Sequence, residues 1–326
     1  MTTVNRHLAW LLDWGNLASV MRILITGGSG FIGSHLAESF QGEADVRVLD
    51  NLATGHGVNL AGLEVDFRRG NIMDEVALEG AMVGVDYVFH LAAMVSVPVS
   101  VGDPLGCEEV NGVGVVRVLE AAALAGVKKV FFASSAAVYG DNPVVPKTEA
   151  MLPEPKSPYA ITKLQGEHWC RFYHGEGRVK TAALRFFNVF GPRQDPRGAY
   201  AAAVPIFIEK ALKGEPLTIF GDGSATRDFI FVKDIVAAIR HVTLTPELTG
   251  VRNAGYGGTI TVKALAEKIV ELAGSNSEIR YLPERPGDVK HSHAAVDELT
   301  ATGFQPVSSL EQGLAATLEF FHRLHH

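Results

Sequence analysis

The chain has 326 residues, of which 47% are hydrophobic and 20% are charged, and its formal net charge is −7. This balance is typical of a soluble globular protein with one large or two closely joined domains. The negative charge argues against nucleic acid and anionic membranes as partners. The two cysteines, Cys107 and Cys170, lack the spacing of a metal site, and we expect them to be reduced thiols of a cytoplasmic protein.

The first twenty residues precede the regular pattern. Their apolar stretch is interrupted by Asp13 and is shorter than a membrane span. It also lacks the basic region and long apolar run of a signal peptide. We interpret residues 1–20 as an N-terminal extension and expect no association with membranes.

Short apolar runs alternate with helical patterns from residue 21 to residue 187. Continuous apolar strands separated by helices are typical of a parallel sheet covered on both faces. The sequence therefore predicts an α/β fold with a Rossmann-like, doubly wound parallel sheet. The expected strands are Arg22–Ile25, Val46–Leu49, Val65–Phe67, Tyr87–Phe89, Val130–Ala133 and Thr181–Leu184, and the expected helices are Phe31–Phe40, Val76–Met82, Leu105–Ala125 and Tyr159–Tyr173.

The alternation of strand and helix patterns becomes less regular beyond residue 187, where loops lengthen and glycine and proline become frequent. We expect residues 188–326 to form mainly a smaller α/β domain for the substrate, with a return segment near 230–255 that rejoins the first domain. No internal repeat or low-complexity linker separates the two. The expected helices are Ala202–Lys213, Ile235–Val242, Val262–Leu272 and Leu310–Phe321.

A glycine-rich turn joins the first strand to the first helix. Gly27, Gly30 and Gly33 have the G-x-x-G-x-x-G spacing that permits a tight turn and close approach of the backbone to a pyrophosphate. The following helix N-terminus offers free N–H groups to the phosphates. Asp50 ends the second strand, where a carboxylate binds ribose hydroxyls and repels a 2′-phosphate. The pattern predicts a domain, residues 21–187, that binds NAD in preference to NADP.

Tyr159 and Lys163 are four residues apart and therefore share one face of a helix, for which Ser157 and Pro158 supply a start signal. A tyrosine that acts as a base near pH 7 needs its pKa lowered by about three units. A neighbouring ammonium and a cationic nicotinamide favour such lowering. Ser135, at the end of the fifth strand, is placed to hydrogen-bond a reacting hydroxyl.

These residues resemble those of the extended short-chain dehydrogenase/reductase superfamily, and most closely its UDP-galactose and UDP-N-acetylglucosamine 4-epimerases. The resemblance covers about residues 21–322. It is carried by the glycine turn and by seven further motifs: His90–Ala93, Ser134-Ser135, Tyr159 with Lys163, Phe186–Gly191, Gly223–Phe229, Gln194–Ala202 and Arg285–Ser292.

The resemblance implies a role for each matching residue. Tyr159 matches the catalytic base, Lys163 the lysine on the nicotinamide ribose, and Ser135 the assisting hydroxyl. NAD contacts are implied for Phe31, Ile32, Asn51, Asn71, Ile72, Ala92 and Ala93. Contacts to the UDP-sugar are implied for Ser96, Asn188, Ala199, Tyr200, Arg227, Arg285, Asp288 and Ser292. No metal is implied.

One position above all indicates which sugar the pocket accepts. Ser292 matches a gatekeeper at which a bulky aromatic restricts the pocket to plain hexoses, whereas a small residue admits a 2-acetamido group. We therefore expect activity on UDP-GlcNAc/UDP-GalNAc, on UDP-Glc/UDP-Gal, or on both. Two departures from the family pattern are Asn71, where relatives carry Asp, and Phe229, where many carry Tyr.

The implied reaction inverts C4 of a UDP-hexose through a 4-keto intermediate, with NAD⁺ regenerated in each cycle. A 4,6-dehydratase or a decarboxylase is disfavoured, because the acidic residues it needs after Ser135 are replaced here by Ala136 and Ala137. UDP-glucuronate 4-epimerase stays an alternative. A non-catalytic NAD-binding regulator is disfavoured by the presence of Tyr159 and Lys163.

The resemblance also implies a homodimer built by pairing the helices near Leu105–Ala125 and Tyr159–Tyr173. Apolar residues of these helices serve either that surface or the contact with the sheet. They are Val115, Val118, Leu119, Leu164 and Phe172.

Overall fold

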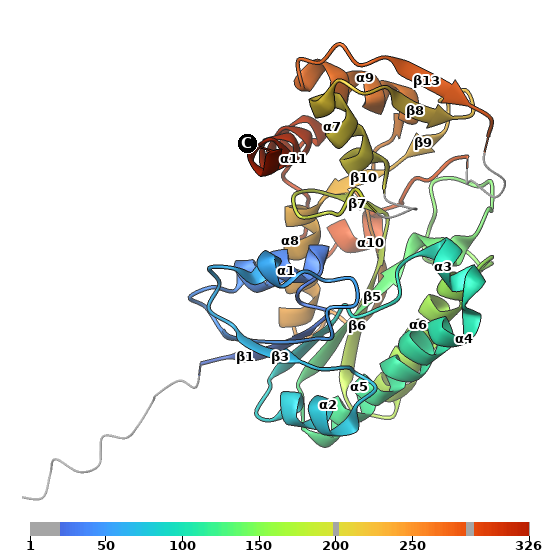
Figure 1. Ribbon diagram of the computed structural model, residues 1–326. Coiled ribbons are helices and arrows are strands. Elements are labelled where there is room, and N and C mark those ends of the chain that lie inside the picture. The colour runs from blue at the N-terminus through green and yellow to red at the C-terminus, as the bar shows by residue number, and fades with distance from the viewer. Residues whose placement is uncertain (1–19, 198–201, 285–289, 326) are drawn as a thin grey trace, which may run out of the picture.

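A seven-stranded sheet forms the centre of the computed structural model, which describes residues 20–197, 202–284 and 290–325 (Figure 1). Its strand order is β11-β6-β5-β4-β1-β2-β3, and all neighbouring strands are parallel. The strands are β1 (Arg22–Thr26), β2 (Asp45–Asp50), β3 (Asp66–Arg69), β4 (Tyr87–His90), β5 (Lys129–Ser135), β6 (Lys180–Phe186) and β11 (Gly250–Ala254). The predicted doubly wound parallel sheet is confirmed.

The strand order reverses at β1. The chain first builds outward through β2 and β3, and then crosses back to place β4 on the other side of β1. In open parallel sheets, ligands bind beyond the carboxyl ends of the strands at such a switch point. The crevice between the ends of β1 and β4 is therefore the expected binding position.

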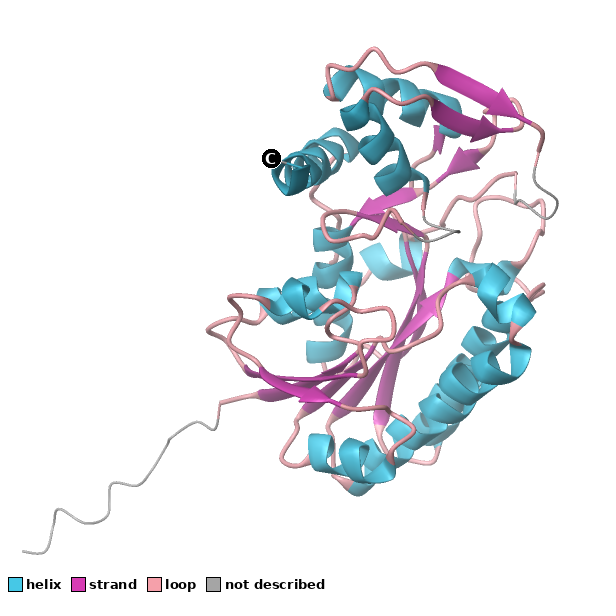
Figure 2. Cartoon of the chain, viewed as in Figure 1, coloured by secondary structure: helices cyan, strands magenta, loops and turns pink. Residues whose placement is uncertain are grey.

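Burial on both faces explains why the inner strands of the sheet are mostly apolar. Ile23 and Ile25 of β1 join one core, whereas Leu24, between them, joins the other. Helices α1 (Phe31–Ser39) and α8 (Val232–Leu244) cover the first face, as Figure 2 shows. The second face is covered by α2 (Glu75–Met82), α5 (Gly114–Leu124) and α6 (Pro158–Gly175). Burying each such side chain contributes about 1.5–3 kcal/mol.

The helix expected over Leu105–Ala125 is not one regular helix. After α3 (Val97–Gly102), the chain forms α4 (Pro104–Cys107), a π-helical turn η2 (Glu108–Val113), and then α5. Asn111, within the π-helical turn, donates to Met94 O at 3.0 Å and accepts from Met94 N at 2.8 Å. It also donates to Thr162 Oγ1 of α6 at 3.3 Å. The turn thus brings a buried carboxamide to the segment that follows β4.

The remaining elements form a smaller region beyond the carboxyl ends of the sheet strands (Figures 1 and 2). A third apolar core holds this region together, and the chain passes from it back into the main sheet through α8 and β11. Its helices are α7 (Ala203–Lys213), α9 (Val262–Leu272) and α11 (Leu310–His325), and its paired strands are β7 (Asn188–Phe190) with β10 (Phe229–Phe231), β8 (Leu217–Phe220) with β13 (Ile279–Leu282), and β9 (Thr226–Arg227) with β12 (Ile260–Thr261). The short helix α10 (Asp297–Thr300) lies against β11 instead, and its Leu299 belongs to the first core.

Two further observations complete the fold. Cys107 and Cys170 are both buried and unpaired. Within residues 20–197, 202–284 and 290–325, no helix is long and apolar enough to cross a membrane.

Candidate active site

The glycine turn is packed too closely to accept side chains. Gly27 has φ +73°, and a Cβ atom there would lie 2.7 Å from the backbone N of Ala92. A Cβ atom on Gly33 would lie only 2.3 Å from the carbonyl oxygen of Gly27. The turn therefore lies directly against both α1 and the segment after β4, which carries Ala92 and Ala93.

Two features of this turn fit a bound pyrophosphate. Gly30, the N-cap of α1, has no side chain to cap the helix, so it leaves the first-turn amides at Phe31 and Ile32 to an anion. The hydroxyl oxygen of Ser29 is buried, and no hydrogen-bond partner for it is present in the described part of the chain. A buried polar atom without a partner is uncommon, and a ligand phosphate would satisfy it.

Asp50 lies beside the same turn. Its Oδ2 accepts from Ser29 N at 2.9 Å, and its Oδ1 accepts from Leu52 N at 2.8 Å. These bonds fix a buried carboxylate at the end of β2, where the sequence predicts the ribose contact. Asn51 and Asn71 are both exposed just after β2 and β3, and each accepts a hydrogen bond from a nearby backbone amide, whereas Ile72 is buried in the core.

The three predicted catalytic residues meet at the end of β5. Ser157 caps α6 by accepting from Ala160 N at 3.2 Å, and Pro158 is the first helical residue, as the sequence predicts. Lys163 Nζ donates to Ala133 O of β5 at 2.8 Å and lies 5.7 Å from the centroid of the Tyr159 ring. The side chains of Tyr159 and Ser135 are hydrogen-bonded.

Burial dominates the electrostatics of this group. It lowers the pKa of Lys163 to about 8, so the ammonium is still charged at pH 7. Burial raises the pKa of Tyr159, and the hydrogen bond from Ser135 opposes this shift. With these side chains alone the pKa of Tyr159 stays above its ordinary value, so a further positive charge beside the phenol is needed to make it a base.

The predicted sugar-nucleotide residues belong to several elements. Ser96 Oγ caps α3, accepting from Val99 N at 3.3 Å, and Asn188 Nδ2 of β7 donates to Asp228 O at 2.9 Å. Arg227 belongs to β9, a short strand that pairs with β12. Ser292 N donates to Thr226 O at 3.0 Å, so Ser292 lies beside that strand. Ala199, Tyr200, Arg285 and Asp288 lie outside the described residues.

Further residues of the site carry weak sequence signals. Tyr159 N donates to Ser100 Oγ of α3 at 3.2 Å. The hydroxyl of Ser134 donates to Glu167 Oε1 at 2.5 Å. Glu167, which was not predicted from the sequence, follows Lys163 by one helical turn, and this spacing is the only sequence signal it has. Ala136 and Ala137 begin the short helix η3 (Ala136–Tyr139) and bring no acid or base.

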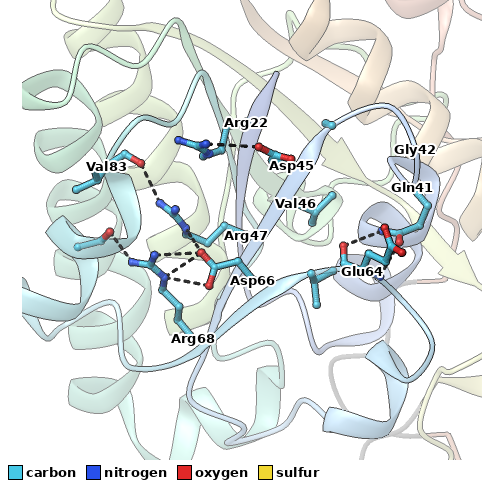
Figure 3. Close-up of a pocket in the computed structure, with 13 residues that line it drawn as sticks. Arg22, Gln41, Gly42, Asp45, Val46, Arg47, Glu64, Asp66, Arg68 and Val83 are labelled. Atoms are coloured by element: carbon cyan, nitrogen blue, oxygen red, sulfur yellow. Dashed lines mark hydrogen bonds and ion pairs between the residues drawn. The ribbon is translucent and has the colours of Figure 1, made fainter. Parts of the chain in front are cut away.

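A separate hollow of about 630 Å³ lies at the opposite end of the strands, near the starts of β1–β3 (Figure 3). Its arginines are already paired: Arg47 with Asp66 at 2.7 Å, Arg68 with Asp66 at 3.0 Å, and Arg22 with Asp45 at 3.4 Å. This hollow is therefore a poor candidate for the chemistry. Across the described residues, no group of three or more His, Cys, Asp or Glu side chains could hold a metal ion.

Comparisons with known proteins agree with this geometry. The model of the NAD dependent epimerase/dehydratase family matches residues 23–255. The UDP-glucose 4-epimerase of Mycolicibacterium smegmatis is 40% identical over 313 residues, which are 92% of this chain and 98% of that protein.

Two solved structures are similar over nearly the whole chain. The UDP-N-acetylglucosamine 4-epimerase from Methanobrevibacter ruminantium M1, in complex with UDP-N-acetylmuramic acid, is 39% identical with a TM-score of 0.90, covering 93% of this chain and 99% of that chain. The UDP-glucose 4-epimerase of Thermus thermophilus, in complex with NAD, is 38% identical with a TM-score of 0.86, covering 93% and 99%. The chain therefore belongs to the NAD-dependent epimerase/dehydratase family.

Proposed function

We propose that this protein is an NAD-dependent epimerase that inverts C4 of a UDP-hexose through a 4-keto intermediate. The observation that carries the proposal is the meeting of Tyr159, Lys163 and Ser135 at the carboxyl end of β5, in the same crevice as the glycine turn. The similarity to 4-epimerases over more than nine tenths of the chain supports the reaction type.

The residues around the glycine turn hold NAD. The amides of Phe31 and Ile32 and the hydroxyl of Ser29 bind the pyrophosphate, and Asp50 binds the adenosine ribose. Bound NAD⁺ supplies reversible hydride transfer at C4, and its cationic nicotinamide is the further charge that favours the phenolate of Tyr159.

Residues of the chain itself transfer the proton of the C4 hydroxyl. Tyr159 takes the proton of the C4 hydroxyl as the ketone forms, and returns it when the opposite alcohol forms. Ser135 hydrogen-bonds the reacting oxygen and Tyr159. Lys163 keeps a positive charge beside the phenol and contacts the nicotinamide ribose. Asn188 and Arg227 bind the diphosphate, so that the UDP stays fixed while the keto sugar turns its other face.

The substrate is UDP-GlcNAc/UDP-GalNAc, alone or alongside UDP-Glc/UDP-Gal. Ser292 supports this preference, because its small side chain beside β9 leaves room for a 2-acetamido group. UDP-glucuronate differs from UDP-glucose at C6 alone, and it is the comparison substrate that any assay of this protein requires.

The protein is proposed to be a cytoplasmic homodimer. Its two buried, unpaired thiols fit a reducing compartment. Val115, Val118 and Leu119 are buried against the sheet and cannot serve a dimer surface, whereas Phe172 is exposed on α6. Ile161 of α6, Leu105 of α4 and Val113 of η2 are exposed too and extend this apolar face. Phe172→Glu is expected to convert a particle of two chains into one of a single chain, as measured by light scattering.

A conversion assay tests the function. Purified protein is incubated without added cofactor with UDP-GlcNAc, UDP-Glc or UDP-glucuronate, and the C4 epimers are followed by NMR. We expect UDP-GalNAc from UDP-GlcNAc, and at least about 10³-fold less product from Tyr159→Phe, which cannot accept the proton. Conversion of UDP-glucuronate alone would contradict the proposed substrate, and no conversion of any sugar, even with added NAD⁺, would contradict the function.

A further inference from the structure

A buried ion pair lies directly behind the catalytic group. Arg185 of β6 donates to both carboxylate oxygens of Glu167 on α6, at 2.8 and 2.7 Å. The two side chains are only 6% and 3% exposed. Burying such a pair costs desolvation energy that its attraction often fails to recover, and apolar residues of similar volume are frequently as stable. Stability alone therefore gives a weak reason for this pair.

The ion pair is hydrogen-bonded to the chain on both sides of Ser135. On one side, Ser134 Oγ donates to Glu167 Oε1 at 2.5 Å. On the other side, Arg185 Nη1 donates to the hydroxyl of Tyr139 at 2.8 Å, at the end of the short helix that begins just after Ser135. Ser135 is thus held between two anchors that meet in one ion pair.

The same pair is built into the helix that carries the base. Tyr159, Lys163 and Glu167 follow one another at four-residue intervals, so they form one stripe along α6. Lys163 also reaches β5, through its bond to Ala133 O. The distance between Ser135 on β5 and Tyr159 on α6 is therefore fixed by charged and hydrogen-bonded contacts as well as by packing.

The network continues toward the predicted sugar pocket. The Tyr139 hydroxyl donates to Asn253 Oδ1 at 2.6 Å. Asn253 Nδ2 in turn donates to Ala295 O at 3.2 Å and to Lys147 O at 2.8 Å. Ala295 lies three residues beyond Ser292 on the same segment. Tyr139, Asn253 and Arg185 are all buried.

We propose that Glu167 and Arg185 are positioning residues of the epimerase, which hold Ser135 in register with Tyr159 for proton transfer. This inference rests on the proposed function. A displacement of about 1 Å in a reacting group can lower a rate about 10²-fold, and the ion pair prevents such a displacement through Ser134 and Tyr139.

Two mild variants remove one anchor each. Ser134→Ala deletes the hydroxyl on Glu167, which keeps Arg185 as its partner, and Tyr139→Phe deletes the hydroxyl on Arg185. We expect each to lower kcat about tenfold, while KM for the UDP-sugar changes by less than about twofold, because the residues that bind the nucleotide are untouched. Arg185→Met removes the Tyr139 anchor and leaves Glu167, the acceptor of the Ser134 anchor, without its ion-pair partner. This variant is expected to lower kcat about 10²-fold.

The matched control is Arg47→Met in β2. Arg47 is also buried and ion-paired, with Asp66 at 2.7 Å, but it lies near the start of β2, away from the carboxyl ends of the strands (Figure 3). The Arg47→Met variant is expected to have a lower melting temperature and an unchanged kcat. A purely structural role for Arg185 predicts that the two Arg→Met variants behave alike.

Two readouts separate positioning from loss of stability. With substrate deuterated at C4, the isotope effect on kcat is expected to rise in Ser134→Ala and Tyr139→Phe, because the chemical step becomes slower than product release. The acid limb of the pH profile of kcat/KM is expected to move to higher pH, since the Ser135 hydrogen bond lowers the pKa of Tyr159. Neither is expected in Arg47→Met.

The outcomes are distinct. An active wild type whose Ser134→Ala and Tyr139→Phe variants keep full kcat, with unchanged isotope effects and pH profiles, overturns this inference and leaves the proposed function standing. If Arg185→Met fails to fold, the two mild variants still decide the question. A wild type that converts no UDP-sugar overturns the proposed function and this inference together.

Discussion

Replacing Gly33 by alanine tests the glycine turn where its geometry is tightest. The added Cβ would lie 2.3 Å from Gly27 O and 2.7 Å from Gly28 Cα, whereas an ordinary contact begins at 3.4 Å. Both neighbours are backbone atoms, so α1 and the turn must separate by about 1 Å. We expect this overpacking to cost about 1–3 kcal/mol of folding free energy.

The same separation moves the amides that bind the pyrophosphate. Losing one or two hydrogen bonds to a charged group costs about 1.5–3 kcal/mol each, so the Kd for NAD is expected to rise about 10²-fold. Gly175→Ala is the control, because Gly175 ends α6 with no atom within 4 Å of the added Cβ. Calorimetric titration of the NAD-free proteins measures the Kd for NAD of both variants. A Gly33→Ala protein that binds NAD as tightly as the Gly175→Ala protein would refute the reasoning.

Three further predictions concern pH, the sugar and the cofactor. Burial lowers the pKa of His35 to about 4 and that of His90 to about 3, below the 6.5 of an unfolded histidine. The unfolded chain therefore binds more protons below pH 6.5. The contribution of the two neutral histidines to stability is fully present above that pH. By pH 5, each histidine is expected to lower the free energy of unfolding by about 2 kcal/mol. Urea unfolding at pH 7 and 5 measures this loss, and an equal loss in His35→Gln would contradict it. Ser292→Tyr is expected to lower kcat/KM for UDP-GlcNAc about 10²-fold and to spare UDP-Glc; equal loss for both sugars would remove Ser292 as the gatekeeper. Asp50→Ala is expected to raise the Kd for NAD about tenfold and to narrow the preference over NADP in calorimetric titrations, since the repelling carboxylate is gone; an unchanged preference would speak against the ribose contact.

The central sheet could be predicted because burial on both faces leaves a local signal. Ile23–Ile25 of β1, Tyr87–Phe89 of β4 and Val130–Ala133 of β5 are continuous apolar runs, and a polar residue follows each of them. The exact bounds were less predictable: β3 ends at Arg69 and not at Phe67, because its pairing with β2 continues through two polar residues. The π-helical turn around Asn111 also has no sequence signal, because it depends on the contact with Met94.

The short strands of the smaller region could not be predicted. β9 has only two residues, and its partner β12 lies more than thirty residues further along the chain. Pairing at that distance is decided by how the third core packs, which no local pattern records.

The catalytic group was predictable because its members are tied to local signals. Tyr159 and Lys163 have helical spacing behind an N-cap, and Ser135 ends a buried strand. Glu167 and Arg185 were missed, because a glutamate on a helix and an arginine on a strand are usually solvent-exposed. Their burial follows from the contact between α6 and β6, which only the fold brings together.

Retention of a C4 label tests the transient ketone most directly. UDP-GlcNAc deuterated at C4 is incubated with the protein in ordinary water, and the UDP-GalNAc formed is examined by NMR and mass spectrometry. Because the hydride removed from C4 is returned to the same carbon within one active site, the product is expected to keep its deuterium at C4. Loss of the label to solvent would mean that inversion proceeds by removal of a C–H proton, and it would contradict the account.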